Sequence, residues 1–199
     1  MNEPTGQQRA AAPASDLPDE CLQRTLAWFE KAVIGLNLCP FAKAVHHKGQ
    51  IRWVKSGAQT DQQLLQTLQS EMQHLCASDA DSIDTTVIVH PLWLQDFGDF
   101  NAFMDLAEAL LETLELDGVL QIASFHPQYQ FAGTRRDDIT NFSNRSPYPT
   151  LHLLREDSVS RAVDNHPETA DIYRNNQRRL RQLGQAGWQA LFEDDGKNA

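Results

Sequence analysis

Cysteine is scarce in this sequence, and long apolar runs are absent. The three cysteines, Cys21, Cys39 and Cys76, are odd in number and irregularly spaced, which excludes a disulfide framework and a paired zinc ribbon. No apolar run approaches the ~20 residues that a membrane span needs. The first residues lack the basic start and apolar core of a signal peptide. The sequence therefore predicts a cytoplasmic protein with reduced thiols and no membrane partner.

Basic residues are also few, since 17 Lys and Arg face 27 Asp and Glu and the formal net charge is −10. This balance opposes general binding to a phosphate backbone, and no nucleic-acid partner is expected. The nucleotide-binding patterns GxGxxG and GxxxxGK[ST] are missing too. The one basic cluster is typical of a solvated helix face; it consists of Arg174, Arg178, Arg179 and Arg181.

The chain length of 199 residues and a hydrophobic content of 41% suit a single globular domain. Residues 1–15 are rich in Ala, Pro, Gln and Ser without periodicity, so we expect a disordered tail. We expect one α/β domain over residues 16–193 and a flexible C-terminus over 194–199.

Apolar periodicity predicts alternating helices and strands. Cys76 falls on the apolar face of the second helix, so we expect its thiol in the core, while Gly184 and Gly187 predict breaks in the last helix. The helices are expected at 19–36, 61–76, 100–114 and 168–192, and the strands at 51–57, 85–91, 119–127 and 150–156.

The order helix-strand-helix-strand-helix-strand-strand-helix predicts a mixed, mostly parallel sheet of about four strands covered by helices. Two successive strand–helix–strand crossovers make the first three strands parallel. VIVHP and ASFHP each run a strand into a histidine followed by proline, which ends the strand. His90 and His126 should therefore lie at the same carboxyl edge, where such sheets bind ligands.

The connection from Pro127 to Pro149 is longer than a hairpin needs, which favours a binding or lid role over a disordered insertion. The fourth strand should run antiparallel beside the third, bringing His152 to the same edge. A functional histidine and a satisfied, half-buried one are both compatible with its position. Four aromatic residues could pack the loop: Tyr129, Phe131, Phe142 and Tyr148.

GLNLCPFA (35–42), SFHPQYQF (124–131) and NRSPYPTLHLLRED (144–157) resemble the signature segments of an uncharacterised bacterial domain-of-unknown-function family. The resemblance extends from about residue 19 to about residue 190. It implies no reaction, cofactor or substrate, only positions that match the motifs: Cys39, Pro40, His126, Asn144, Arg145, Ser146 and His152.

Three functions remain open, and no cofactor is indicated. The first is a small-molecule site for a carboxylate or phosphate, with His126 and Cys39 as catalytic residues. Its substrate-binding residues would be Tyr129, Asn141, Asn144, Arg145, Ser146 and His152. The second is a metal site made from His90, His126 and His152, with Cys39 or Asp138 as further ligands. The third is a non-catalytic interaction protein. The oligomeric state is open.

Two residues carry alternative interpretations. Cys39 is either a structural residue in a turn or a nucleophile or ligand, because CPFA is similar to redox and glutathione-transferase motifs but lacks their second cysteine and their preceding strand. Arg145 is either a preorganised clamp for an anion or a staple that pairs with Asp137, Asp138 or Glu156 to order the loop.

Overall fold

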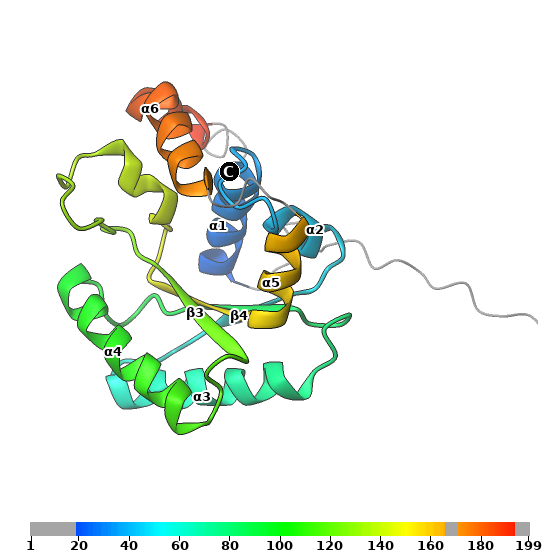
Figure 1. Cartoon of the computed structure of the whole chain (residues 1–199). Helices are drawn as coiled ribbons and strands as arrows, with labels where there is room; N and C mark the ends of the chain where they lie inside the picture. Colours follow the sequence, from blue (N-terminus) through cyan, green and yellow to red (C-terminus); the bar gives the residue numbers. More distant parts are fainter. Residues whose placement is uncertain (1–18, 166–170, 194–199) are drawn as a thin grey trace, which may run out of the picture.

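The computed structural model describes residues 19–165 and 171–193, which form a single sheet covered by helices on both faces (Figure 1). The expected tail at 1–15 and C-terminus at 194–199 lie outside the described residues. Four strands pair in the order β1-β2-β4-β3. They are β1 (Ile51–Lys55), β2 (Thr85–Val89), β3 (Leu120–Phe125) and β4 (Thr150–Arg155).

The expectation of a mostly parallel sheet is wrong. Strand β4 pairs antiparallel with β3, as expected, but it also lies between β2 and β3 and pairs antiparallel with β2. Among the strands of the described residues, only β1 and β2 form a parallel pair. The first three strands still point the same way, as the crossovers require, but the inserted strand separates the second from the third.

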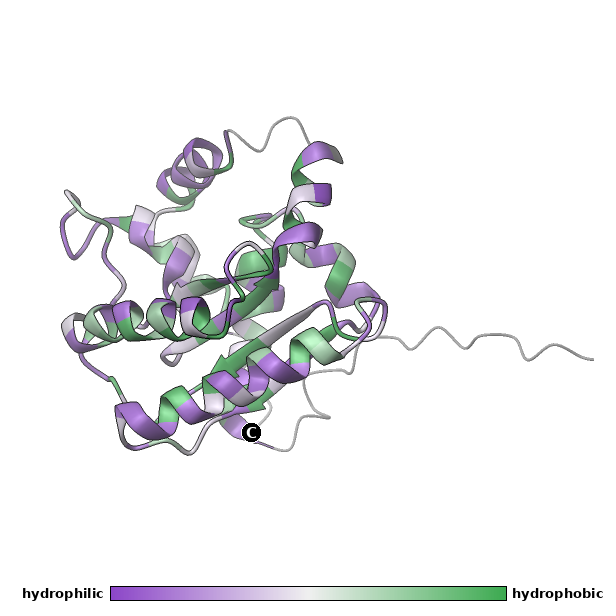
Figure 2. Ribbon diagram, turned by 60° about the horizontal axis from the view of Figure 1, so that its bottom comes forward, coloured by the Kyte–Doolittle hydropathy of each residue, from purple (hydrophilic) through white to green (hydrophobic). Residues whose placement is uncertain are grey.

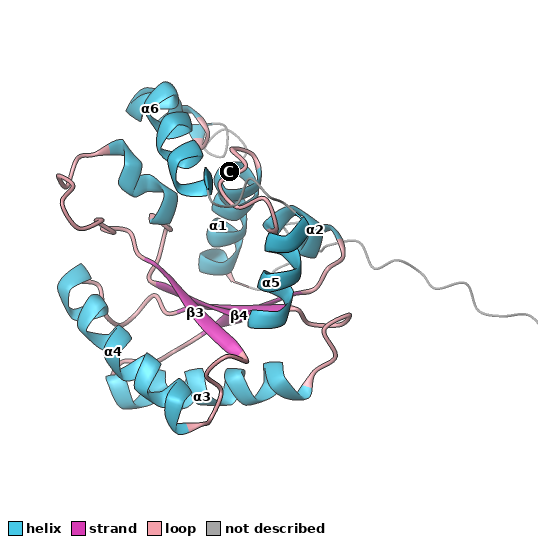
Figure 3. Cartoon of the chain, viewed as in Figure 1, coloured by secondary structure: helices cyan, strands magenta, loops and turns pink. Residues whose placement is uncertain are grey.

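Two crossover helices cover one face of the sheet: α3 (Asp61–Ala77) and α4 (Phe97–Thr113). Each begins at a side chain that accepts hydrogen bonds from backbone N–H groups, Thr60 for α3 and Asp96 for α4. Both crossovers move across the sheet in the same direction, so their helices lie on the same side (Figure 3). Leu68, Phe100 and Leu153, all almost fully buried, belong to the core on this face.

The opposite face carries α1 (Glu20–Trp28), which continues as a π-helix, η2 (Phe29–Ile34), and the short α2 (Ala42–His47). It also carries α5 (Glu156–Asn165) and α6 (Ile172–Ala190). Gly184 interrupts α6 with a positive φ of 65°, the break expected there, whereas Gly187 does not. Figure 2 shows hydrophobic residues concentrated on the strands and hydrophilic ones on the outer sides of the helices.

The long connection between β3 and β4 is folded and contains the 3-10 helix η3 (Ile139–Asn144), which packs against α6. Backbone hydrogen bonds tie its end to the sheet, because His126 N–H donates to the Asn144 carbonyl and His90 N–H to the Pro149 carbonyl. The loop therefore lies across the carboxyl ends of β2 and β3, where the inserted β4 begins.

The elements that sequence periodicity missed are short: α2, η3 and α5. The buried location expected for the Cys76 thiol is also wrong, because this residue is exposed whereas Cys21 is buried. The buried face of α3 runs through Leu68, Met72 and Leu75, and the next residue turns away from the sheet. Within the described residues, no helix is long and apolar enough to span a membrane.

Candidate functional site

His90 and His126 lie at the same edge of the sheet, as the strand ends predict, and both rings pack against Phe100. The ring centroids lie 5.7 Å and 5.1 Å from that of Phe100, respectively. Both histidines are 0% exposed. Their side chains therefore fill the core between the sheet and α4 rather than facing an open site.

The two nitrogens of the His126 ring already have partners inside the protein. Nε2 lies 3.1 Å from the Leu94 carbonyl oxygen, to which it donates, and Nδ1 accepts from the Gln128 N–H at 3.0 Å. Burial lowers the pKa of His126, so its neutral form is favoured. The ring has no free nitrogen with which to move a proton to or from a ligand.

His90 is similar except that one nitrogen is unpaired. Nδ1 lies 3.2 Å from the Trp93 carbonyl oxygen, and Nε2 is buried with no partner in the described part of the chain. Burial lowers the pKa of His90 to about 4. The arrangement is that of a neutral histidine held in a core.

The Arg145 side chain orders the loop by donating to backbone carbonyls of that loop. Nε donates to the Tyr129 carbonyl at 3.0 Å and one terminal nitrogen donates to the Arg136 carbonyl at 2.5 Å. The guanidinium also lies 4.5 Å above the centroid of the Phe142 ring. This geometry favours a loop staple over an anion clamp, although its partners are carbonyl oxygens and not the carboxylates expected.

The neighbouring polar residues are used in the same way. Asn141 is fully buried, and its oxygen accepts from Phe131 N–H and the Thr134 hydroxyl. Asn144 donates to the Ser124 carbonyl, and the Ser146 hydroxyl donates to the Tyr148 carbonyl. Tyr129 packs its ring against Phe97 and Phe131. The loop residues that we expected to bind a ligand thus hold the loop together.

The three histidines considered as metal ligands do not converge. His152 points to the opposite face of the sheet, where it lies beside Thr85 and Phe125, whereas His90 and His126 face α4. Among the described residues, no group of three or more His, Cys, Asp or Glu could hold a metal ion. The structure therefore gives no support to the predicted three-histidine site.

A cavity of about 590 Å³ lies on the face of the sheet opposite α3 and α4. Its floor is formed by strand residues, among them Val87, Ala123 and His152, and its walls come from α1, η2, α2 and α5. Ala123 pairs in register with His152, and its small side chain leaves room above β3. Aromatic side chains make much of the lining: Trp28, Phe29, Phe41, Trp53 and Phe125.

On the cavity floor, His152 and Thr85 form a short hydrogen-bonded pair. The Thr85 hydroxyl oxygen lies 2.5 Å from His152 Nε2 and 2.5 Å from the Leu153 carbonyl oxygen. Burial lowers the pKa of His152 to about 4. The ring is thus a neutral polar group in a mostly apolar space, which is a common feature of ligand sites.

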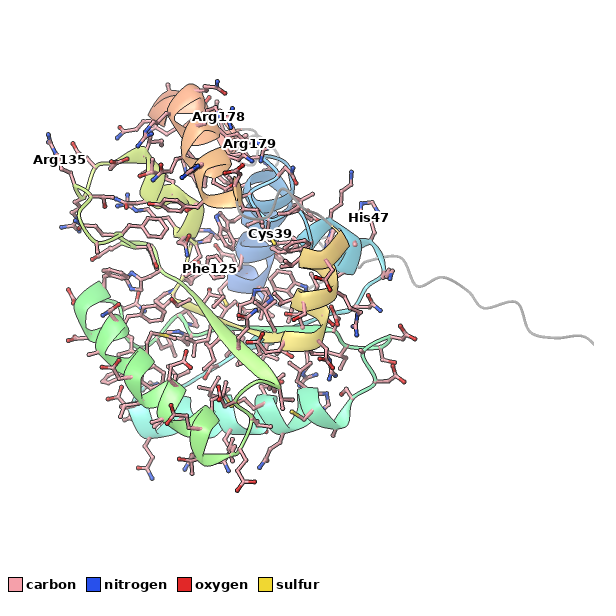
Figure 4. All side chains as sticks on the ribbon, viewed as in Figure 1. Cys39, His47, Phe125, Arg135, Arg178 and Arg179 are labelled. Atoms are coloured by element: carbon pink, nitrogen blue, oxygen red, sulfur yellow. The ribbon has the colours of Figure 1, made fainter. Side chains whose placement is uncertain are left out.

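Cys39 lines the same cavity, in the turn before α2 (Figure 4). Burial raises the pKa of its thiol, and hydrogen bonds from the N–H groups of Phe41 and Ala42 only partly oppose this. The thiol form therefore dominates at neutral pH, and a thiolate nucleophile is not favoured. Cys39 shares the cavity with His152 and not with His126.

Charged side chains of both signs border the cavity. Lys48 and Arg161 are exposed, and Asp84 accepts a hydrogen bond of 2.5 Å from Ser158. Arg155 also borders it, but its guanidinium donates to the Leu75 and Ser78 carbonyls and others nearby. These groups do not make a concentrated cationic site of the kind that would select an anion.

Sequence reasoning named three residues of this cavity, Cys39, Pro40 and His152, but missed Thr85 on its floor and the helices that form its walls. Thr85 carried one usable signal, since it opens a β-branched strand whose alternate residues share a face with it. In the sequence, Trp28 has the spacing of a core residue on an amphipathic helix. In the structure its Nε1–H is buried and has no partner in the described part of the chain.

The fold and the cavity define a single α/β domain with one mixed sheet, packed on one face and partly packed around a cavity on the other. The chain belongs to a family described as "Protein of unknown function (DUF1415)", whose model matches residues 20–190. This confirms the resemblance seen in three segments of the sequence. No curated protein and no solved structure is significantly similar to the chain.

All three signature segments contribute to the cavity. GLNLCPFA supplies Cys39 and three residues after it, and SFHPQYQF supplies Phe125. NRSPYPTLHLLRED supplies His152 with Thr150, Leu154 and Arg155. Segments far apart in the chain thus meet at one place, which is not the histidine edge predicted from the strand ends.

Proposed function

We propose that this protein binds a small, largely apolar molecule in the cavity above β3 and β4. The observation that carries the proposal is a space of about 590 Å³ with aromatic walls and a neutral histidine on its floor. Known ligand sites have roughly 300–1,000 Å³, are lined mainly by apolar and aromatic side chains, and carry a few placed polar groups.

The location differs from the carboxyl edge that the sequence suggested. There, Asn141 and Arg145 use their polar atoms on the loop itself, so an anion would have to displace existing hydrogen bonds. In the cavity, by contrast, apolar surface on Trp53 and Phe125 is available for a ligand to cover. Because Cys39 is held as a thiol, we propose binding rather than covalent catalysis.

A cavity-filling substitution tests the proposal. Ala123→Phe places a ring beside His152 on the cavity floor, in a strand where an aromatic residue is well tolerated. We expect small aromatic fragments to shift NMR signals of cavity residues in the parent protein and not in this variant. Ala102→Phe, at an exposed position on α4, is the matched control and should bind as the parent does.

Ala162→Phe, on the α5 wall, is a second way to fill the same space if Ala123→Phe does not fold. The proposal fails if no fragment shifts cavity signals in the parent protein, or if a folded cavity-filled variant binds fragments as tightly as the parent. Native mass spectrometry of the purified parent would show whether a molecule is already bound.

A further inference from the structure

The hydrogen bonds of Thr85 determine which nitrogen of His152 carries the proton. A threonine hydroxyl has one hydrogen to donate, and a carbonyl oxygen can only accept. The Leu153 carbonyl oxygen, 2.5 Å away, therefore receives that hydrogen. The hydroxyl oxygen must then accept from His152 Nε2, which lies at the same distance of 2.5 Å. His152 is consequently protonated on Nε2.

The other nitrogen of the ring, Nδ1, is then an acceptor. It has no hydrogen bond within the described residues. Since it is not one of the buried polar atoms without a partner, it is accessible. The His152 ring lines the cavity, and its register neighbours on both sides, Val87 and Ala123, offer no polar side chain. The cavity is the direction from which Nδ1 can receive a hydrogen bond.

We propose that the molecule bound in this cavity is neutral where it meets His152 and donates a hydroxyl or N–H hydrogen to Nδ1. This inference rests on the proposed function and narrows it to a class of ligand: an apolar body that carries one neutral donor group. A carboxylate or phosphate at this position would bring its lone pairs against the lone pair of Nδ1.

Charging the ring to accommodate an anion is opposed by the surroundings. An imidazolium would need two acceptors, and a buried charge without full pairing is costly. Burial already lowers the pKa of His152 to about 4, so the ring stays neutral at pH 7. A ligand that has no donor displaces water from Nδ1 and leaves this nitrogen unpaired, which weakens binding.

Long-range proton–nitrogen NMR of the parent protein at neutral pH tests the tautomer without any ligand. The His152 signals are identified by their loss in His152→Gln. We expect a protonated Nε2 and an unprotonated Nδ1, and a shift toward mixed tautomers in Thr85→Val. A protonated Nδ1, a charged ring, or an unchanged spectrum in a folded Thr85→Val variant would overturn the inference. If that variant does not fold, the parent spectrum decides.

Three probes of similar size then test the ligand class: naphthol, its methyl ether, and naphthoate. We expect naphthol to bind roughly tenfold more tightly than the ether, because only naphthol can donate to Nδ1, and naphthoate to bind most weakly. Equal binding of naphthol and its ether, or tighter binding of naphthoate, overturns this inference while the cavity proposal stands. If none of the probes binds the parent, the proposed function itself fails.

Discussion

Two adjacent threonines at the start of β2 differ in what their hydroxyl groups contact. Thr85 faces the cavity side and bonds to both His152 and the Leu153 carbonyl. Thr86 faces the packed side and is fully buried, and its hydroxyl has no partner in the described part of the chain. Comparing the two residues separates the stabilisation by a hydrogen-bonded buried hydroxyl from the destabilisation by one that has no hydrogen bond.

Replacing each threonine by valine, which has nearly the same shape, should have different effects on stability. Thr85→Val should lower the free energy of unfolding by about 1–3 kcal/mol, because it leaves His152 Nε2 unpaired. Thr86→Val should be neutral or stabilising, because it removes a buried polar group that lacks a hydrogen bond. Urea unfolding of the two variants measures the difference, and equal losses would contradict the hydrogen-bond assignment.

Residue-scale roles could be predicted from the sequence only in part. The strand-and-proline pattern placed His90 and His126 at one edge, and the structure has them there against Phe100. The pattern could not show that the Trp93 and Leu94 carbonyls would each contact one ring nitrogen, of His90 and His126 respectively, because those contacts depend on how the following loop returns. A polar residue at the end of a strand can belong to a ligand site, or it can lie in the core and bond to the carbonyls of the next loop.

At the scale of elements, the sequence predicted the strands but not their order. Apolar alternation marks a strand without stating its neighbours. The expected antiparallel pairing of β4 with β3 is confirmed, because consecutive strands often pair directly, but the pairing of β4 with β2 was not predicted. On the packed face β4 contributes Leu151 and Leu153, which are 0% exposed, and on the other face His152 and Leu154 are partly buried. Such a strand belongs in the middle of a sheet, and that signal was present in TLHLLRE.

The loop between β3 and β4 tests a second element-scale contact, the Arg145 staple. Arg145→Lys keeps the charge but loses the fork that reaches the Tyr129 and Arg136 carbonyls. We expect a loss of about 1–2 kcal/mol in unfolding free energy and faster hydrogen exchange in residues 129–144.

Arg135→Lys is the matched control for that loop. The Arg135 side chain is 86% exposed, points outward at the tip of the loop in Figure 4, and pairs only with Asp137 in the described structure. Its replacement should leave stability within about 0.5 kcal/mol of the parent. If Arg145→Lys behaves in the same way as this control, Arg145 does not staple the loop.

At the scale of the whole molecule, the two faces of the sheet are packed differently. Leu153 is fully buried in the packed core, whereas its neighbour Leu154 lines the cavity. Leu153→Ala should cost about 3 kcal/mol, since it opens a void among close-packed side chains. Leu154→Ala should cost clearly less, because its side chain already borders empty space. Similar losses in urea unfolding would show that Leu154 does not border a cavity.

The buried histidines should also make the whole molecule sensitive to mild acid. The pKa values of His90 and His152 lie near 4, below the ordinary value of 6.5 that an unfolded chain would show. As the pH falls, the unfolded chain therefore takes up these protons first. Stability is full above about pH 6.5 and is lost as the pH falls from there toward 4.

At pH 5 each of the two histidines should have removed about 2 kcal/mol of unfolding free energy, and His126, whose pKa is also lowered, acts in the same direction. Urea unfolding between pH 7.5 and pH 5 measures the slope, in a window above the range where ordinary carboxylates titrate. His152→Gln should reduce the change of unfolding free energy with pH by the amount that one of these histidines contributes. His74→Gln, at an exposed position on α3, is its control. Stability that stays flat across this window would mean that these rings are not held neutral by the fold.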